Sequence, residues 1–401
     1  MRVAIVGAGP AGACLALLLA RRGLDVVLVE RERDFARVFR GEGLMPTGFD
    51  ALEQMGLAGA LAGLPGRALE RWDTHLDRKL VMSIPEPTAG LGERALRAVP
   101  QGQLIERVVE AAAAHACFAF ESPATFREVV REDGRVRGVR VAGSQDERVL
   151  PADFVVGTDG RASAVRTREG IALELFPEHY DVVWMKLPLP PGLAGRSPFQ
   201  IFASGPEVAF AYVSWDGRWQ VGWLLEKGGW KAARSRDWLA ECAALFPEAL
   251  ARHLLAHGDA LEGPSLLDVI VGRCPVWHAP GVLLVGDAAH PMSPIRAQGI
   301  NLALRDAIVA ANHLVPALEA GRDLAPACAA IQAEREPEIV AVQRLQLREA
   351  RGQRWARERP WLMAPLMKLA PLLARAGLLQ RAWLRQQAPL RYGVTQVQLR
   401  V

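Results

Sequence analysis

The sequence of 401 residues contains little cysteine, and its cysteines are scattered. The five are Cys14, Cys117, Cys242, Cys274 and Cys328, and no two of them form a Cys-x-x-Cys pair. Closely spaced cysteines are the usual signature of a structural metal site or of a disulfide framework. Their absence argues against both and favours a reducing compartment. We therefore expect a cytoplasmic protein with no metal in its functional site.

Long uninterrupted apolar runs are also missing. The most apolar stretch, residues 4–20, is interrupted by Gly7, Gly9, Pro10 and Gly12. A membrane-spanning helix needs about 20 consecutive apolar residues, so this stretch is better interpreted as a strand, a turn and a helix. The strand begins within the first residues of the chain, and we expect no signal peptide before it.

Most of the chain also lacks an excess of positive charge. The formal net charge is +4, but residues 344–401 hold 12 Arg and Lys against two acidic residues, so the rest carries −6. A basic pI that belongs to one terminal segment does not indicate a nucleic-acid-binding protein. Half of the residues are hydrophobic and 23% are charged. This is an ordinary globular composition, and the length allows two domains.

The N-terminal segment combines two apolar strands with a glycine-rich turn. We expect strands over residues 3–6 and 26–29, with a helix over 10–22 between them. The positive end of that helix and its unpaired N–H groups would face the turn. This arrangement is typical of a dinucleotide-binding unit.

The glycines of this turn match the Gly-x-Gly-x-x-Gly fingerprint. Gly7 permits the tight turn, Gly9 lets the backbone approach a pyrophosphate, and Gly12 lets the helix lie close to the strand. Glu30 follows the second strand, where a carboxylate can accept a hydrogen bond from a ribose hydroxyl. The fingerprint alone does not separate NAD from FAD. No second complete fingerprint occurs in the sequence, so we expect one permanently held dinucleotide.

Two further apolar runs end in a glycine next to an aspartate. Residues 153–158 lead into Asp159-Gly160, and "GVLLV" at 281–285 leads into Gly286-Asp287. A buried, unpaired carboxylate is costly, so Asp287 should have a polar partner.

The three motifs, in this order, resemble those of the p-hydroxybenzoate-hydroxylase-like flavoprotein monooxygenases, the single-component group A enzymes. The resemblance spans residues 1 to about 320. It implies an α/β fold: a Rossmann-like FAD-binding domain with an inserted antiparallel-sheet substrate domain and a C-terminal helical tail. FAD would be bound, and NAD(P)H would bind transiently.

The resemblance also implies roles for individual residues. Asp287 would accept a hydrogen bond from a ribityl hydroxyl of FAD, and the loop at Pro294 would lie beside the isoalloxazine ring. The helix that opens at Gly299, Ile300 and Asn301 would aim its N-terminus at the flavin N1/O2 edge, where a helix dipole favours the reduced anion. The Asp159-Gly160 motif would support the diphosphate region and NAD(P)H access. The complete expected cofactor set is Gly7, Gly9, Ala11, Gly12, Glu30, Arg31, Arg40, Gln101, Asp159, Gly160, Gly286, Asp287, Pro294, Gly299, Ile300 and Asn301.

Arg40 and Gln101 belong to this set on weaker grounds. Arg40 begins the segment 40–57 and Gln101 leads a helix within 99–112, and both segments resemble cofactor-contacting parts of the family. They also fit a loop-helix connector and an ordinary amphipathic helix. One departure concerns Ala297-Gln298-Gly299, where the family usually has Gly-Gln-Gly. The extra methyl group would narrow the space over the flavin or alter ring movement.

The expected domains alternate along the chain. Alternating apolar and aromatic residues predict antiparallel strands in 72–84 and 180–226, with a hairpin at Asp216-Gly217. We assign residues 1–71, 98–170 and 273–343 to the FAD-binding domain, 72–97 and 171–272 to the substrate domain, and 344–401 to basic, amphipathic C-terminal helices. Nine side chains could line a substrate pocket, about half of them being sheet core instead: Trp184, Met185, Phe199, Phe202, Phe210, Tyr212, Trp215, Trp219 and Trp223.

The resemblance implies a monooxygenase that uses NAD(P)H and O2 to hydroxylate an aromatic or polyketide-like small molecule through a flavin C4a-hydroperoxide. Such chemistry needs few side chains besides those that exclude water. His290 and His179 are the visible candidates for a base, but His290 fits the FAD motif and His179 fits the surface. We therefore assign no catalytic residue.

Three alternatives remain open at this point. A reductase of the prenyl-reductase type would also carry an aromatic-rich strand at 217–229. A flavin halogenase is disfavoured because the Trp-x-Trp-x-Ile-Pro motif is absent, its nearest echo being residues 219–223. A non-catalytic flavin-binding protein is the third. The sequence sets no oligomeric state.

The basic tail is expected to form two short amphipathic helices over 357–390, broken by Pro365, Pro371 and Gly377. Their apolar sides would pack on the protein, cap the substrate pocket or settle on an anionic membrane surface, where Trp361 and Trp383 would suit the interface.

Overall fold

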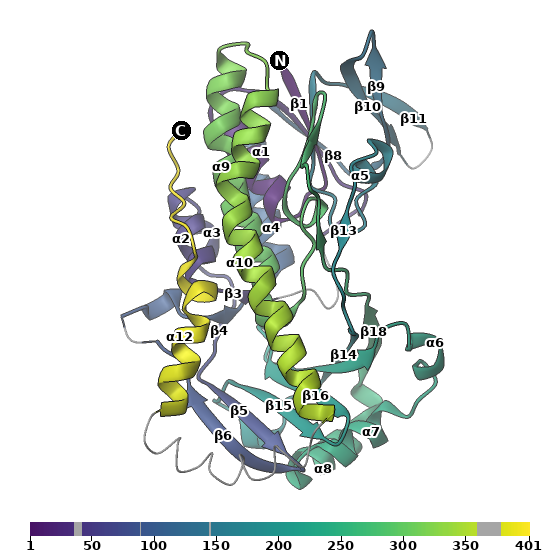
Figure 1. The fold of residues 1–401 in the computed structure, drawn as a ribbon, viewed down its shortest axis with the longest axis vertical. Helices are drawn as coiled ribbons and strands as arrows, with labels where there is room; N and C mark the ends of the chain where they lie inside the picture. Colours follow the sequence, from purple (N-terminus) through teal and green to yellow (C-terminus); the bar gives the residue numbers. More distant parts are fainter. Residues whose placement is uncertain (36–41, 89, 144–145, 359–377) are drawn as a thin grey trace.

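The computed structural model describes residues 1–35, 42–88, 90–143, 146–358 and 378–401. Two large sheets lie toward opposite ends of the molecule, and the long helix α10 (Ala325–Glu358) runs from one toward the other (Figure 1). The fold is the mixed α/β architecture that the sequence predicted.

The first sheet has six strands in the order β20-β21-β12-β1-β2-β8. Its strands are β1 (Arg2–Val6), β2 (Asp25–Val29), β8 (Phe118–Glu121), β12 (Phe154–Gly157), β20 (His278–Ala279) and β21 (Val282–Leu284). All pairings are parallel except β20 with β21. The central strands are continuous apolar runs buried on both faces, as parallel strands between two layers require. Their carboxyl ends meet at one edge, where Val6 pairs with Val29 and Gly157.

Helices and a small sheet enclose these strands. α1 (Pro10–Arg21) packs against α4 (Gln101–Ala113) and α9 (Gln298–Glu319), and α9 packs against α10. A three-stranded sheet of β9 (Thr125–Glu132), β10 (Arg135–Ala142) and β11 (Glu147–Pro151) contacts β12 and β1. The buried side chains of these layers form the largest core cluster of the described chain.

The second sheet has seven strands in the order β18-β14-β17-β16-β15-β5-β6. They are β5 (Arg71–Leu76), β6 (Lys79–Pro85), β14 (Tyr180–Leu187), β15 (Pro198–Ser204), β16 (Glu207–Val213), β17 (Trp219–Glu226) and β18 (Glu262–Leu267). The expected hairpin is confirmed, since β16 pairs antiparallel with β17 and Gly217 in the turn has φ +79°. Strands far apart in sequence therefore share one sheet, with β5 parallel to β15.

The remaining elements are short connections and covering helices. They are β3 (Gly43–Leu44), β4 (Arg67–Ala68) and β7 (Arg97–Ala98) in one small sheet, β13 (Glu174–Leu175) with β19 (Gly272–Arg273), helices α2 (Pro46–Gln54), α3 (Ala58–Leu61), α5 (Ala164–Arg168), α6 (Trp230–Ala233), α7 (Trp238–Leu245) and α8 (Glu248–Ala256), and 3-10 turns at Gly92–Arg94, Pro191–Leu193, Gly258–Ala260, Gly286–Ala288 and Ile295–Ala297.

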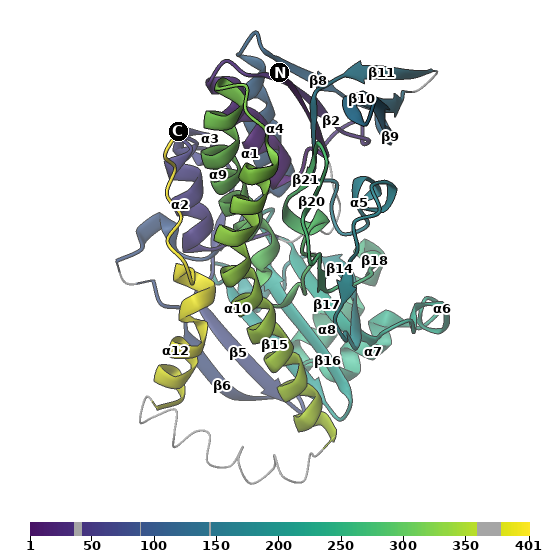
Figure 2. The ribbon, with the colours of Figure 1, turned by 45° about the horizontal axis from the view of Figure 1, so that its top comes forward.

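The C-terminal segment returns to the second sheet. α12 (Leu378–Tyr392) lies beside β5 and β6 in both views (Figures 1 and 2). The Trp383 and Trp72 ring centroids are 5.5 Å apart, and Arg391 forms a buried ion pair with Glu86. Of the two expected helices, the structure describes this second one; Trp361 and the expected breaks at 365, 371 and 377 lie outside the described residues. Trp383 therefore packs within the protein, and no described helix is long and apolar enough to span a membrane.

Candidate active site

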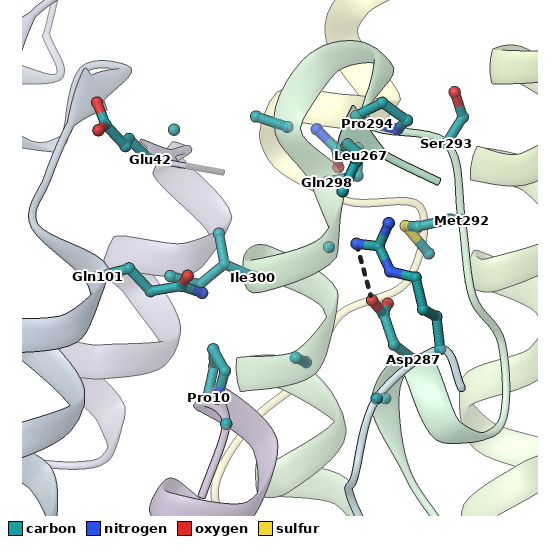
Figure 3. Close-up of a pocket in the computed structure, with 18 of the residues that line it drawn as sticks. Pro10, Glu42, Gln101, Leu267, Asp287, Met292, Ser293, Pro294, Gln298 and Ile300 are labelled. Atoms are coloured by element: carbon teal, nitrogen blue, oxygen red, sulfur yellow. Dashed lines mark ion pairs between the residues drawn. The ribbon is translucent and has the colours of Figure 1, made fainter. Parts of the chain in front are cut away.

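A cavity of about 840 Å³ is lined by residues of both large sheets. Figure 3 shows part of its wall, with Pro10 of α1, Gln101 of α4 and Ile300 of α9 near one another, and Asp287, Met292 and Ser293 across the cavity. The glycine turn and the α9 N-terminus lie at the edge where the parallel strands end. This is the general location of ligand sites in open α/β sheets.

The glycine turn has the geometry that was predicted for each of its three glycines. Gly7 has φ +104°, and a Cβ there would lie 2.6 Å from the carbonyl oxygen of Thr158. A Cβ at Gly12 would lie 2.1 Å from the oxygen of Gly7, so the helix lies against the strand only because this side chain is absent. At Gly9 the nearest atom would be 3.9 Å away, and Gly9 lines the cavity. The turn therefore leaves backbone open to a ligand where the fingerprint puts the pyrophosphate.

Glu30 lies at the end of β2 beside this turn and is 4% exposed. Its carboxylate accepts hydrogen bonds from the backbone N–H groups of Ala8, at 2.9 Å, and Glu32, at 3.0 Å. These bonds fix the carboxylate at the cavity wall. The position suits a ribose hydroxyl.

The Asp287 carboxylate, which the sequence predicted to have a polar partner, is not fully buried. Its side chain is 31% exposed, and the nearest cation among the described residues is Arg161, with 4.0 Å between Nη2 and Oδ2 (dashed line in Figure 3). The carboxylate faces the cavity because Gly286, with φ +65°, turns the chain there. Asp287 is thus available to a ligand hydroxyl.

The Asp159 carboxylate has a local structural role. It accepts hydrogen bonds from the backbone N–H groups of Ala164, at 2.6 Å, and Val165, at 3.0 Å, and so fixes the start of α5. Asp159, Gly160 and Arg161 still line the cavity.

The N-terminus of α9 also reaches the cavity, through Gly299 and Ile300. Asn301 does not line it. Its Oδ1 accepts from the Met45 N–H at 2.8 Å, and its Nδ2 donates to the Gly43 carbonyl at 3.2 Å. Asn301 therefore braces α9 against the loop at β3, a contact that local sequence cannot reveal.

The loop before α9 contains two consecutive non-glycine residues in the left-handed region, Arg296 with φ 64° and Ala297 with φ 50°. This conformation costs an L-residue roughly 1–2 kcal/mol. The methyl of Ala297 lies 2.7 Å from the position that a Cβ on Gly43 would occupy. Ala297, where the family usually has glycine, therefore holds the backbone in an unfavourable conformation and places a methyl group close to Gly43.

The cavity wall includes most of the expected cofactor residues. Gly12 and Asn301 support it from behind, and Arg40 lies outside the described residues. Those that line it are Gly7, Gly9, Ala11, Glu30, Arg31, Gln101, Asp159, Gly160, Gly286, Asp287, Pro294, Gly299 and Ile300.

The second sheet presents an aromatic face to the same cavity. Trp184, Phe199, Phe210 and Tyr212 line it, and the Phe199 ring is within 12° of parallel to those of Phe210 and Tyr212. The opposite face packs on α7 and α8 and carries the other expected residues, namely Met185, Phe202, Trp219 and Trp223. Trp215 lies instead under the Lys186 ammonium group. The Trp184 ring is nearly perpendicular to those of Phe210 and Tyr212. An apolar aromatic wall of this kind is suited to a ring system.

The identity follows from comparison with known proteins. A family model described as an FAD binding domain matches residues 1–341. The 6-methylpretetramide 4-monooxygenase of Streptomyces rimosus is 37% identical over 364 residues, covering 87% of this chain and 83% of that enzyme. This chain belongs to the group A FAD-dependent aromatic monooxygenases. It is a hydroxylase, and its cofactor is FAD.

Other relatives of this monooxygenase agree. Kynurenine 3-monooxygenase of Salinispora arenicola is 29% identical over 356 residues, covering 84% of this chain and 76% of that enzyme. The crystal structure of P. aeruginosa PqsL in complex with 2-aminobenzoylacetate has a TM-score of 0.72 at 26% identity, covering 86% of this chain and 94% of that one. p-Nitrophenol 4-monooxygenase from Pseudomonas putida DLL-E4, with a TM-score of 0.76 at 19% identity over 97% of this chain and 98% of that one, shows the shared fold. None of these relatives is a prenyl reductase.

Neither histidine that we considered as a base in the monooxygenase lines the cavity. His290 is buried, with Nε2 at 2.8 Å from Oδ2 of Asp306, whose other oxygen pairs with Arg335. His179 lies beside Arg354, at 3.3 Å. His290 therefore belongs to a buried network behind the Gly286-Asp287 turn.

Glu42 was not expected as a site residue, yet it is a buried carboxylate in the cavity wall. Burial raises its pKa to about 7, although Lys186 and a hydrogen bond from Ser214 lower it. The available signal was the single acid in the glycine-containing segment 41–48. Lys186 on β14 and Ser214 in the β16–β17 connection lower the pKa of Glu42, and neither could be assigned as a partner from that segment.

A cluster around Arg296 was also not expected from the sequence. The Arg296 guanidinium lies 4.8 Å from the Trp72 ring centroid and 5.8 Å from that of Trp383. It pairs with Glu349 at 3.1 Å, and Glu349 lines the cavity. The loop before α9, the seven-stranded sheet, α10 and α12 therefore meet at one wall of the cavity.

Proposed function

We propose that this monooxygenase uses NAD(P)H and O2 to hydroxylate a phenolic, polycyclic aromatic compound of the polyketide type. The observation that carries the proposal is one cavity that joins a dinucleotide cradle to an aromatic wall. The substrate named for the S. rimosus relative supports the same class of compound.

The residues present fit FAD. Gly9 and the start of α1 would receive the diphosphate, and Glu30 would accept a hydrogen bond from the ribose. Asp287 would accept from a ribityl hydroxyl, and the N-terminus of α9 would stabilise negative charge on the ring. Bound FAD, once reduced by NAD(P)H, would supply the electrophilic oxygen from O2.

The protein's own contribution is to orient the substrate and exclude water. Phe199, Phe210 and Tyr212 would stack along the face of a flat substrate, since aromatic pairs favour parallel offset geometry. Trp184 adds a donor, because its indole Nε1 is buried at the cavity wall without a hydrogen-bond partner among the described residues. A substrate carbonyl or hydroxyl oxygen would satisfy it. The apolar wall would keep water from the reacting oxygen.

The direct test uses the purified chain, which we expect to be yellow from noncovalently bound FAD. NADH and NADPH oxidation should be stimulated by 6-methylpretetramide more than by L-kynurenine, and one atom of ¹⁸O2 should appear in the product. If 6-methylpretetramide stimulates NAD(P)H oxidation but no ¹⁸O enters it, the enzyme does not hydroxylate this compound. If L-kynurenine stimulates NAD(P)H oxidation more strongly, the substrate class is an aminoaryl compound and not a polycyclic one.

A further inference from the structure

We propose that Glu42 accepts the hydroxyl proton of a phenolic substrate, and that Ser214, Lys186 and Asp216 connect it to solvent. This inference rests on the proposed function, because it requires a phenol in the cavity. Glu42 comes from the loop just before β3, while its three partners come from β14 and from the β16–β17 connection. The two parts of the protein meet at this carboxylate.

The geometry forms a short path from the cavity outward. Glu42 lines the cavity, and its two oxygens lie 2.8 and 3.0 Å from the hydroxyl of Ser214. Lys186 Nζ is 3.8 Å from Oε1 of Glu42 and 2.7 Å from Oδ2 of Asp216. Side-chain exposure rises along the path, from 8% for Glu42 to 12% for Lys186 and 24% for Asp216. The Ser214 hydroxyl and the Trp215 backbone N–H donate to this carboxylate, whose two oxygens offer about four acceptor directions, so it can accept a further hydrogen bond.

The charges around Glu42 suit a base that works near neutral pH. Burial raises the Glu42 pKa to about 7; Lys186 and Ser214 lower it, and Asp216 raises it. A carboxylate with this pKa is ionised just above pH 7 and can still hold a proton for release, as general base catalysis favours.

The other titratable groups nearby do not replace it. Burial, with Glu42 and Asp216, raises the pKa of Tyr212 well above its usual value, so the phenol stays protonated and acts as a donor. Arg67 and Arg97 line the adjoining wall of the same cavity as cations. A guanidinium group has hydrogen-bond donors but no acceptor, so neither arginine can take the proton of the substrate.

The proton balance is simple. The Glu42 carboxylate takes the proton of the substrate hydroxyl and becomes a carboxylic acid, leaving a phenolate whose ring carbons are more electron-rich. One such carbon bonds to the electrophilic oxygen as the bond between the two oxygen atoms breaks, and it then loses its hydrogen as a proton to solvent. The phenolate oxygen takes its proton back from Glu42. Overall, the substrate, O2, NAD(P)H and one proton from solvent give the hydroxylated substrate, NAD(P)+ and water.

The test is the pH dependence of turnover by FAD-loaded enzyme with 6-methylpretetramide as the probe. We expect kcat/KM of the wild type to rise with pH through about 7. Glu42→Gln should lower it about 100-fold or more at pH 8 and remove this dependence. Glu53→Gln, at a surface carboxylate paired with Arg94, is the matched control and should behave as wild type.

Two further variants test the path and do not depend on how well Glu42→Gln folds. Lys186→Met removes a cation that lowers the Glu42 pKa, so the pH midpoint should move up by about one unit. Asp216→Asn removes an anion that raises it, so the midpoint should move down. Shifts of the pH midpoint in opposite directions support the proposal, because a general loss of structure would not move the midpoints of the two variants in opposite directions.

The outcomes distinguish this inference from the proposed function. If the wild type hydroxylates the probe and Glu42→Gln keeps its rate and pH profile, Glu42 is not the proton acceptor and only this inference fails. Lys186→Met and Asp216→Asn profiles that both match wild type would also overturn it. If the wild type binds FAD but does not act on the probe, the proposed substrate class fails, and this inference fails with it.

Discussion

The contact between Gly43 and Ala297 gives a prediction that can be worked out in numbers. Gly43→Ala would place a Cβ 2.7 Å from the Ala297 methyl, whereas ordinary contacts begin at 3.4 Å. Gly43 has no positive φ, so the cost comes from crowding and not from backbone conformation. Overpacking of this kind destabilises by about 1–3 kcal/mol.

Ala297→Gly should have the opposite effect. It removes the methyl that would crowd a Cβ at position 43, and it relieves a left-handed conformation that costs roughly 1–2 kcal/mol. Greater freedom of the unfolded chain offsets about 0.4–1 kcal/mol of that gain. The single variant should therefore be as stable as wild type or slightly more stable. In the double variant the cost of Gly43→Ala should largely disappear, which gives a coupling of about 1–3 kcal/mol.

The assay is urea unfolding of the four FAD-loaded proteins in a double-mutant cycle, followed by circular dichroism. Gly59→Ala is the matched control, because a Cβ at Gly59 would meet nothing within 4 Å. Gly59→Ala should add to Ala297→Gly without coupling. Additive effects of Gly43→Ala and Ala297→Gly, within about 0.5 kcal/mol, would refute the contact and our explanation of Ala297.

Three other predictions concern FAD binding and buried charges. Asp287→Ala should weaken FAD binding about 10- to 100-fold in equilibrium dialysis, through loss of a charge-assisted hydrogen bond, and Gly9→Val should weaken it more by blocking the diphosphate. Asp306→Asn should lower the urea midpoint at pH 7. Burial raises the Asp306 pKa, but His290 and Arg335 outweigh burial and hold the pKa at about 2. This shift contributes about 2 kcal/mol to the free energy of unfolding at pH 7. Glu86→Gln should lower Tm strongly, at a cost of about 3–5 kcal/mol, because it leaves a buried arginine unpaired.

Each of these has a clear contrary result. FAD affinity of Asp287→Ala equal to wild type would reject the ribityl contact. For Asp306 the stabilisation exists above the unfolded pKa near 3.8 and is lost as pH falls through about 2, so the deficit of the variant should shrink in acid. A deficit that is constant from pH 7 to pH 3 would contradict this. A Tm for Glu86→Gln no lower than that of exposed Glu53→Gln would show that the pair with Arg391 is not formed.

The glycine turn could be predicted in detail because its constraints are local. Gly7 needs a positive φ and Gly12 needs the space of a missing side chain, and both requirements act within a few residues. The strands on either side were equally predictable, since they are apolar runs of the right length.

Other residues could not be assigned to the cavity or to the core from the sequence, because their positions depend on contacts with residues far away in the chain. Asn301 looked like a cofactor residue but turns toward Met45, 256 positions away. Alternation along the aromatic strands predicted two faces, but only packing on α7 and α8 decides that Trp223 lies in the core and Trp184 at the cavity. Burial raises the pKa of Glu42, and Lys186, which lowers it in part, lies on β14, 144 positions further along the chain. Such contacts are fixed by topology, which no single segment encodes.

The position of α12 has a consequence for the order in which the protein forms. Both large sheets are complete in the chain before residue 285, yet Trp383 and Gln387 reach the cavity wall through Trp72, Arg296 and Glu349. During synthesis the residues of the FAD cradle are therefore made before α12. The contacts by which α12 holds Trp72, Arg296 and Glu349 at the cavity wall can form only afterwards, so this wall is the later of the two to be completed.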